Sequence, residues 1–134
     1  MGEFPVDVIE GAIGGVPLIV VDGDLDRSSK HVVRDAVDEI FRGAYPPPNV
    51  LVDLTDCTFL DSGGLGVLLY ALGQLRADGW LGLIGVSAGA NRVLTYTGFL
   101  DHEKVRFFSS PSDAAASLAR EKRLLGAEDR ERTE

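Results

Sequence analysis

The sequence predicts a single α/β domain with a mixed β-sheet, an N-terminal antiparallel pair of strands and flanking α-helices. Its 134 residues, 45% of them hydrophobic, suit one domain with a substantial core. Two β-branched segments joined by a glycine-containing turn come first, as in a hairpin. Segments of strand character then alternate with segments of helical period, an order typical of a sheet whose later strands are parallel.

The hairpin and the first helix are expected before residue 43. Residues 6–9 and 16–22 are the two β-branched segments, and glycines between them can adopt the positive φ of a hairpin turn. Over residues 27–42 the apolar side chains recur at helical spacing, with Ser28 or Asp26 as candidate N-caps. A glycine ends this helix and a proline-rich linker follows.

The central strand is predicted over residues 50–54, which are almost continuously apolar, as in an interior strand covered on both faces. The next helix carries one stripe of leucines at helical spacing, namely Leu65, Leu68, Leu69, Leu72 and Leu75. The remaining elements are, in order, a strand over 80–86, a short helix over 91–96, a strand over 104–108 and a closing helix over 113–125. The capping signal Ser-Pro-Ser-Asp at residues 110–113 predicts the start of the closing helix. We expect the domain to occupy residues 1–125 and the polar residues 126–134, which mix acidic and basic side chains, to form a disordered tail.

Composition and charge exclude several classes of partner and site. With 13 basic and 21 acidic residues the net charge is -8, which disfavours direct binding to nucleic acid or to an anionic membrane surface. A single cysteine, Cys57, allows no internal disulfide, and with only two histidines in the chain we expect no metal site and no cofactor. No apolar segment approaches the length of a membrane span and the N-terminus lacks a secretion signal, so a cytoplasmic protein is expected.

The stretch LDSGGLG, residues 60–66, lies where the central strand is expected to turn into the leucine-rich helix. Such a loop is where α/β folds place their sites, because backbone N–H groups and the positive end of the helix dipole meet there. The simplest interpretation is that Ser62 caps the helix while Gly63 and Gly64 allow a sharp turn. A second interpretation is that Ser62 is phosphorylated, which would bring about -1.5 to -2 charges to the helix N-terminus.

Two catalytic interpretations of the same stretch have less support. A hydrolase nucleophile elbow requires glycine two residues before the serine, where this chain has Leu60, and no histidine is placed by its spacing to act as a base. A phosphate-binding P-loop requires a lysine after its last glycine, where this chain has Val67. We therefore expect no catalytic residues.

Three motifs in order carry a resemblance to a known family: GDLD at residues 23–26, VLVDLTDCTFLDSGGLGVLL at 50–69 and VLTYTGFL at 93–100. Together they resemble a STAS domain, and the chain is most similar to the bacterial anti-sigma factor antagonists over about residues 6–118. The resemblance implies a compact mixed sheet with flanking helices, in agreement with the pattern above.

The resemblance also implies a partner-switching function in the regulation of sigma-factor-dependent transcription, as in a stress response. It makes Ser62 the acceptor for a partner that is both a serine protein kinase and an anti-sigma factor, with a phosphatase to reset the switch. By the same carry-over, Asp61 is the neighbour at the helix start, Asp24 and Asp26 are a nearby acidic pair, and these residues with Gly63 and Gly64 contact the partner. The module itself would be non-catalytic.

One departure from the family pattern concerns Gly63, a position that commonly holds Ser, Thr or Ala in the family. Glycine there weakens the first helical turn by about 0.5–1 kcal/mol relative to alanine, so recognition by the kinase could differ. The alternative is a STAS domain that binds without being phosphorylated, as a scaffold, a transporter-associated subunit or a small-ligand sensor, because a fold does not determine a function.

Overall fold

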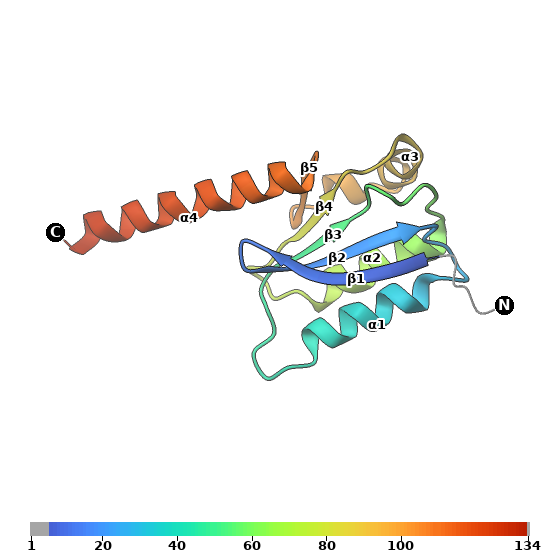
Figure 1. Ribbon diagram of the computed structural model, residues 1–134, viewed down its shortest axis with the longest axis horizontal. Coiled ribbons are helices and arrows are strands. Elements are labelled where there is room, and N and C mark those ends of the chain that lie inside the picture. The colour runs from blue at the N-terminus through green and yellow to red at the C-terminus, as the bar shows by residue number, and fades with distance from the viewer. Residues whose placement is uncertain (1–5, 134) are drawn as a thin grey trace.

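The computed structural model of the chain describes residues 6–133, and residues 1–5 and 134 lie outside the description (Figure 1). The start of the predicted domain 1–125 and the last residue of the predicted tail 126–134 therefore lie outside the described residues. So does the N-terminal end of the chain, where no secretion signal was expected. The strands are β1 (Val6–Ile13), β2 (Val16–Gly23), β3 (Val50–Asp53), β4 (Leu81–Ile84) and β5 (Val105–Phe108). The helices are α1 (Lys30–Phe41), α2 (Ser62–Gln74), α3 (Ala88–Tyr96), the short 3₁₀ helix η1 (Phe99–Asp101) and α4 (Pro111–Thr133).

The five strands form one mixed sheet in the order β1-β2-β3-β4-β5, which confirms the predicted fold class. β1 and β2 are antiparallel, and the pairs β2/β3, β3/β4 and β4/β5 are parallel. β1 is longer than predicted because its pairing continues up to a two-residue turn at Gly14 and Gly15, whose φ values are 58° and 81°. Positive φ at both turn positions matches the twist of a tight hairpin, and glycine adopts it without steric cost.

The sheet is covered on both faces, which explains why every residue of β3 is buried. On one face, side chains of β2, β3 and β4 pack with α1, α2, α3 and η1 in the larger core cluster. On the other face, Leu51, Trp80 and Ile84 pack against Ala114 of α4. The almost continuous apolar character of residues 50–54 therefore has the predicted cause.

The leucine stripe of α2 is partly mispredicted. Leu65, Leu68, Leu72 and Leu75 are buried, but Leu69 is 50% exposed. A helix turns by about 100° per residue, so a side chain next to Leu68 in sequence leaves the buried face. Leu69 thus lies on the outer surface of α2.

α4 begins with the capping box that the sequence predicts. The hydroxyl oxygen of Ser110 accepts the Asp113 N–H at 3.0 Å, and the Asp113 carboxylate accepts the Ser109 N–H at 3.2 Å. The helix then continues to Thr133, past the predicted end at residue 125, and extends away from the sheet (Figure 1). Glutamate, arginine and alanine in this part of the chain are strong helix formers. The domain boundary after residue 125 stays a prediction.

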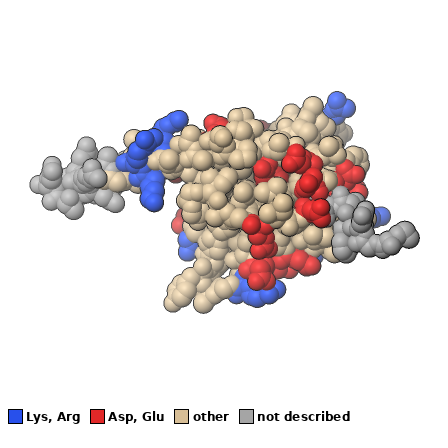
Figure 2. All heavy atoms as spheres, in the orientation of Figure 1, with Lys and Arg blue, Asp and Glu red and all other residues tan. Residues whose placement is uncertain are grey.

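The charges are distributed unevenly over the surface. Figure 2 shows acidic side chains gathered over the β1–β2 pair and α1, and basic side chains along α4. Among the side chains that the structure describes, no group of three or more His, Cys, Asp or Glu residues could hold a metal ion. No described helix combines the length and apolar character needed to cross a bilayer.

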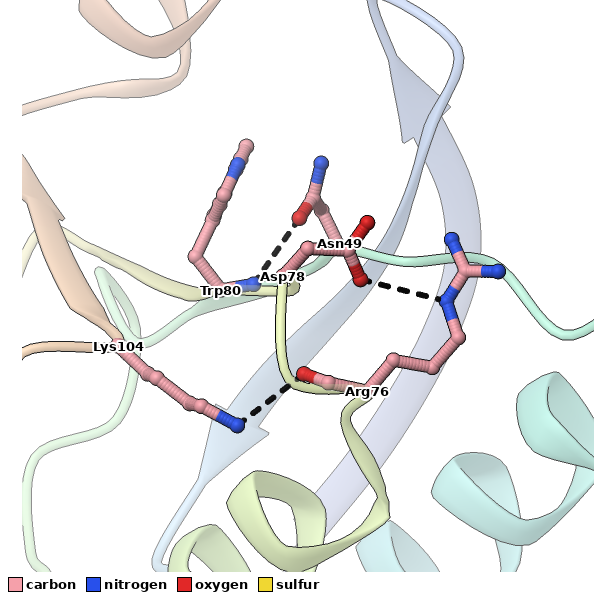
Figure 3. A network of polar contacts seen from close by, with 5 residues as sticks. All are labelled: Asn49, Arg76, Asp78, Trp80 and Lys104. Atoms are coloured by element: carbon pink, nitrogen blue, oxygen red, sulfur yellow. Dashed lines mark hydrogen bonds and ion pairs between the residues drawn. The ribbon is translucent and has the colours of Figure 1, made fainter.

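The amino ends of β3 and β4 are held by a polar network (Figure 3). The side-chain oxygen of Asn49 accepts the Trp80 N–H at 3.0 Å, and the Lys104 ammonium donates to the Arg76 carbonyl at 3.1 Å. Arg76 also pairs with Asp78 at 3.5 Å. These contacts fix the loop that returns from α2 to β4, at the edge of the sheet opposite the start of α2.

Candidate functional site

The hydroxyl of Ser62 lies at the first residue of α2 and is exposed to solvent. In the part of the chain that the structure describes, this side chain makes no hydrogen bond. The interpretation of Ser62 as the helix cap is therefore wrong. The cap is the preceding residue, Asp61, which has the extended backbone (φ −111°, ψ −169°) that an N-cap requires.

The carboxylate of Asp61 contacts both the first turn of α2 and the loop that follows β2. One oxygen accepts the N–H groups of Gly63 at 2.8 Å and Gly64 at 3.1 Å, which satisfies two free donors of the helix start. The other oxygen accepts the Arg27 N–H at 3.4 Å. Asp61 thus caps α2 and also fastens the loop that follows β2.

That loop is paired with the segment preceding α2 by backbone contacts. Leu25 and Leu60 form an isolated parallel bridge, in which the Leu25 N–H donates to the Phe59 carbonyl at 2.9 Å and the Asp61 N–H donates to the Leu25 carbonyl at 3.3 Å. Leu25 is fully buried. The motif GDLD is therefore a structural element that brings two acidic side chains beside the start of α2.

Asp24 and Asp26 have different surroundings in this loop. The Asp24 carboxylate accepts the Thr58 hydroxyl at 3.0 Å, which ties it to the segment before α2. The Asp26 carboxylate accepts the hydroxyl of Ser28 at 2.7 Å and its N–H at 2.9 Å, as well as the Ser29 N–H at 3.1 Å. These bonds, that from the Ser28 hydroxyl above all, lower the pKa of Asp26 below its usual value. The prediction of Ser28 or Asp26 as the N-cap of α1 is wrong, because the cap position is Ser29 and Asp26 instead binds the N–H groups of the turn that precedes the helix.

Gly63 and Gly64 are required by close packing. A Cβ at Gly63 would lie 2.8 Å from the backbone of Arg27, and one at Gly64 would overlap the carbonyl oxygen of Leu25. The departure from the family pattern at Gly63 therefore has a local cause, since the loop after β2 lies directly on the first turn of α2. The loosening expected of glycine is opposed by the Asp61 bonds to both N–H groups.

A hollow of about 300 Å³ opens beside Ser62, between α1 and α2. Its lining residues are Lys30, His31 and Arg34 from α1, and Ser62, Gly63, Gly66, Val67 and Tyr70 from α2. The Arg34 guanidinium lies over the Tyr70 ring, 4.3 Å from its centroid, and the Tyr70 hydroxyl donates to Asp38. The hydrogen bond to Asp38 is the main cause of a raised Tyr70 pKa.

The sequence-based prediction of the site missed the basic residues of this hollow. Lys30 and Arg34 are four residues apart and hence on one face of a helix, which is the signal that was available. That signal does not say which neighbour the face meets. The six residues predicted for the site, by contrast, all lie at the junction of the two loops with α2, and their roles stay predictions.

A larger hollow of about 500 Å³ lies against α4, but its lining contains none of the predicted site residues. It includes Asn49 and Trp80, which belong to the amino ends of β3 and β4. In sheets of this kind ligands bind at the carboxyl ends of the strands. The junction at Ser62 therefore stays the candidate site, in preference to the larger hollow.

The remaining residues singled out in the sequence have no role at the junction. Cys57 is buried and its thiol donates to the Phe59 carbonyl at 3.3 Å, and burial raises its pKa, as expected for an inert core residue. No histidine forms a hydrogen bond to the Ser62 hydroxyl in residues 6–133, although His31 lines the same hollow. The hydrolase interpretation gains no base from this arrangement.

Comparison with known proteins identifies the fold and a family. The family model described as "Mlab, STAS domain" matches residues 12–107, more than two thirds of the chain. No curated protein sequence matches the chain.

Several solved structures are similar to this one, and three of them illustrate the range. An anti-sigma factor antagonist from Mycobacterium paratuberculosis is 20% identical with a TM-score of 0.74, covering 85% of this chain and 94% of its own. The Bacillus cell fate determinant SpoIIAA in the phosphorylated form is 20% identical with a TM-score of 0.58, covering 77% and 92%. A sulfate transporter family protein from Wolinella succinogenes is 19% identical with a TM-score of 0.63, covering 81% and 89%. At these identities the likeness shows a shared fold.

Proposed function

Since the chain belongs to the STAS domain family, we propose that it is an anti-sigma factor antagonist whose binding to a kinase-type anti-sigma factor is switched off by phosphorylation of Ser62. In this proposal it is a non-catalytic, cytoplasmic regulator of sigma-factor-dependent transcription, and a phosphatase resets it. The observation that carries the proposal is the exposed Ser62 hydroxyl, which has no hydrogen bond in the described residues while Asp61 serves as the cap.

The division of roles between Asp61 and Ser62 is what a reversible modification needs. A serine that capped the helix would lose its bond to the backbone when modified, and the fold would oppose the reaction. Ser62 can accept a phosphoryl group without losing a bond, because Asp61 holds the N–H groups of Gly63 and Gly64. The modification therefore changes the surface and leaves the helix start intact.

The expected effect on a partner is electrostatic. The phosphoryl group adds about -1.5 to -2 charges at pH 7, and Asp24, Asp26 and Asp61 lie in the adjoining loops. A partner that fits the unmodified surface would have to match this added charge or dissociate. The outer face of α2 continues from Ser62 through Gly66 and Leu69 to Gly73, all of them exposed, which provides an accessible surface for the partner.

The first experiment is to incubate the protein with ATP and each anti-sigma factor kinase encoded near its gene, and to record the intact mass. We expect a gain of one phosphoryl group that Ser62→Ala abolishes. Ser112→Ala is the matched control, because Ser112 is also an exposed serine in the first turn of a helix and its loss should leave the gain unchanged. A phosphoryl group that remains in Ser62→Ala would contradict the proposal.

A second candidate is a STAS domain that binds a transporter component without being phosphorylated. The likeness to the sulfate transporter family structure favours it. In that case the mass would stay constant with every kinase, and Ser62→Ala would bind the partner as the parent protein does.

A further inference from the structure

We infer that the hollow between α1 and α2 is a receptor for the phosphoryl group on Ser62, in which Lys30 and Arg34 bind the phosphate oxygens. This inference rests on the proposed function, since it describes the modified form of the same serine. It assigns a role to a cavity and to two basic residues that the switch described above does not use.

The shape of the hollow places Ser62 opposite the two cations. Ser62, Gly66 and Tyr70 are spaced four residues apart and form one wall along α2, and Lys30 and Arg34, also four apart, line it from α1. Gly66 keeps this space open, because a Cβ at that position would meet no atom within 4 Å. A phosphoryl group on the Ser62 oxygen would therefore have room at the mouth of the cavity.

The charge of the hollow differs from that of the protein as a whole. The chain carries a net charge of -8, yet the lining that the described residues form contains Lys30, Arg34 and His31 and no acidic side chain. Neither Lys30 nor Arg34 forms an ion pair with a carboxylate among the side chains that the structure describes, those of residues 7–126. Two cations without carboxylate partners are thus grouped beside the one hydroxyl that is proposed to become a dianion.

The donors of the helix start are unavailable to the phosphate. Asp61 already accepts the N–H groups of Gly63 and Gly64, so the new oxygens must find donors in side chains. Lys30 supplies three rotatable donors. The Arg34 guanidinium lies over the face of the Tyr70 ring, an arrangement in which N–H groups along the guanidinium edge can still bind oxygen. The geometry therefore favours an internal contact that joins α1 to α2 in the phosphorylated form.

The internal contact has a regulatory consequence. A phosphate bound by Lys30 and Arg34 is less accessible to a phosphatase than one that projects freely into solvent. It also removes the two cations from the surface offered to a partner. We expect a phosphatase to remove the phosphate more slowly from this protein than from a variant that lacks the two basic side chains. The melting temperature of the phosphorylated protein should also be higher than that of the phosphorylated variant.

The test introduces phosphoserine at position 62 during translation, so that it needs no kinase. The second pKa of the phosphate is then followed by ³¹P NMR in the parent protein, in Lys30→Gln/Arg34→Met, and in Arg92→Gln. Arg92 is an exposed arginine of α3 that lies outside this lining. The titratable residues that line the hollow are Lys30, His31, Arg34 and Tyr70. The nearest carboxylates that the contacts identify are Asp38, which accepts the Tyr70 hydroxyl, and Asp61, which caps α2 beside Ser62.

We expect a second pKa about one pH unit below that of the same phosphoserine in the urea-unfolded chain, because nearby cations favour the dianion. The double variant should lose this difference and Arg92→Gln should keep it. The single variant Arg34→Lys, in which Lys30 is unchanged and position 34 keeps its positive charge, should retain most of this difference in the second pKa. A pKa equal in the parent and the double variant, or raised above the unfolded value by the acidic neighbours, would overturn the inference. Because no kinase takes part, a failure of the proposed kinase switch would leave this result unchanged.

Discussion

At the scale of single residues, the proposed function assigns structure and signalling to two adjacent side chains of the junction. Asp61 satisfies the helix start and fastens the loop after β2, whereas Ser62 makes no hydrogen bond in the described residues and faces solvent. The stability of the domain should therefore depend on the first residue and its regulation on the second.

Replacement of Asp61 tests this separation. Asp61→Ala removes the cap and the bond to the Arg27 N–H, and should lower the free energy of unfolding by about 1–2 kcal/mol. Asp61→Asn keeps an oxygen acceptor, so its loss of free energy of unfolding should be only a small part of the loss for Asp61→Ala. The free energy of unfolding of Ser62→Ala should stay within about 0.5 kcal/mol of that of the parent protein. Urea denaturation monitored by circular dichroism measures all three. A larger loss for Ser62→Ala than for Asp61→Ala would refute the assignment of the cap.

Two glycines of α2 form a matched pair with opposite expectations. A Cβ at Gly64 would overlap the Leu25 carbonyl oxygen, so Gly64→Ala should destabilise the domain, by about 1–3 kcal/mol if the backbone shifts to relieve the overlap. A Cβ at Gly66 meets nothing within 4 Å, so Gly66→Ala should stabilise it by about 0.5–1 kcal/mol through helix propensity. Thermal unfolding of the two variants side by side checks both signs, and equal shifts would contradict the packing described at Gly64.

The predicted and missed parts of the site differ in how local their causes are. The sequence points to the loop LDSGGLG because strand pattern, glycines and cap residues are adjacent in the chain. It does not say which of two neighbouring oxygen-bearing side chains is the cap, since a shift of one residue is compatible with the same pattern. It also cannot associate Lys30 and Arg34 with Ser62, because that proximity depends on the packing of α1 against α2.

At the scale of secondary-structure elements, the carboxyl ends of the strands carry the site and the amino ends carry structural contacts. The loop after β2 and the loop after β3 are joined by the Leu25–Leu60 bridge. At the opposite edge, Asn49 fixes the return from α2 to β4 (Figure 3). The type of each element was predictable from apolar periodicity, whereas details that depend on turns and on tertiary packing were not. β1 runs on to its turn, and Leu69 leaves the buried face.

The contact of Asn49 can be tested independently of the function. Asn49→Ala removes the acceptor of the Trp80 N–H at the start of β4 and should cost about 1–2 kcal/mol of stability. Asn91→Ala, at an exposed position of α3, is the control and should change the unfolding midpoint little. Phosphorylation of Ser62 should be equally efficient in both variants. A reduction confined to Asn49→Ala would mean that the amino-end contacts influence the site.

At the scale of the whole molecule, the chain is acidic, yet a hollow lined by Lys30 and Arg34 lies beside the exposed Ser62. The net charge of -8 disfavours nucleic acid as a direct partner. In the proposed mechanism phosphorylation changes this surface at one place only. The rest of the fold, with its sheet covered on both faces, keeps the loops in position.

The central claim is that a phosphate on Ser62 controls binding to the anti-sigma factor. The most direct measurement is the dissociation constant of that partner, by titration calorimetry, for the unmodified protein and for the protein carrying translationally introduced phosphoserine at position 62. We expect the phosphorylated form to bind about tenfold more weakly or worse, a difference of at least about 1.4 kcal/mol. Equal dissociation constants for the two forms would contradict the account.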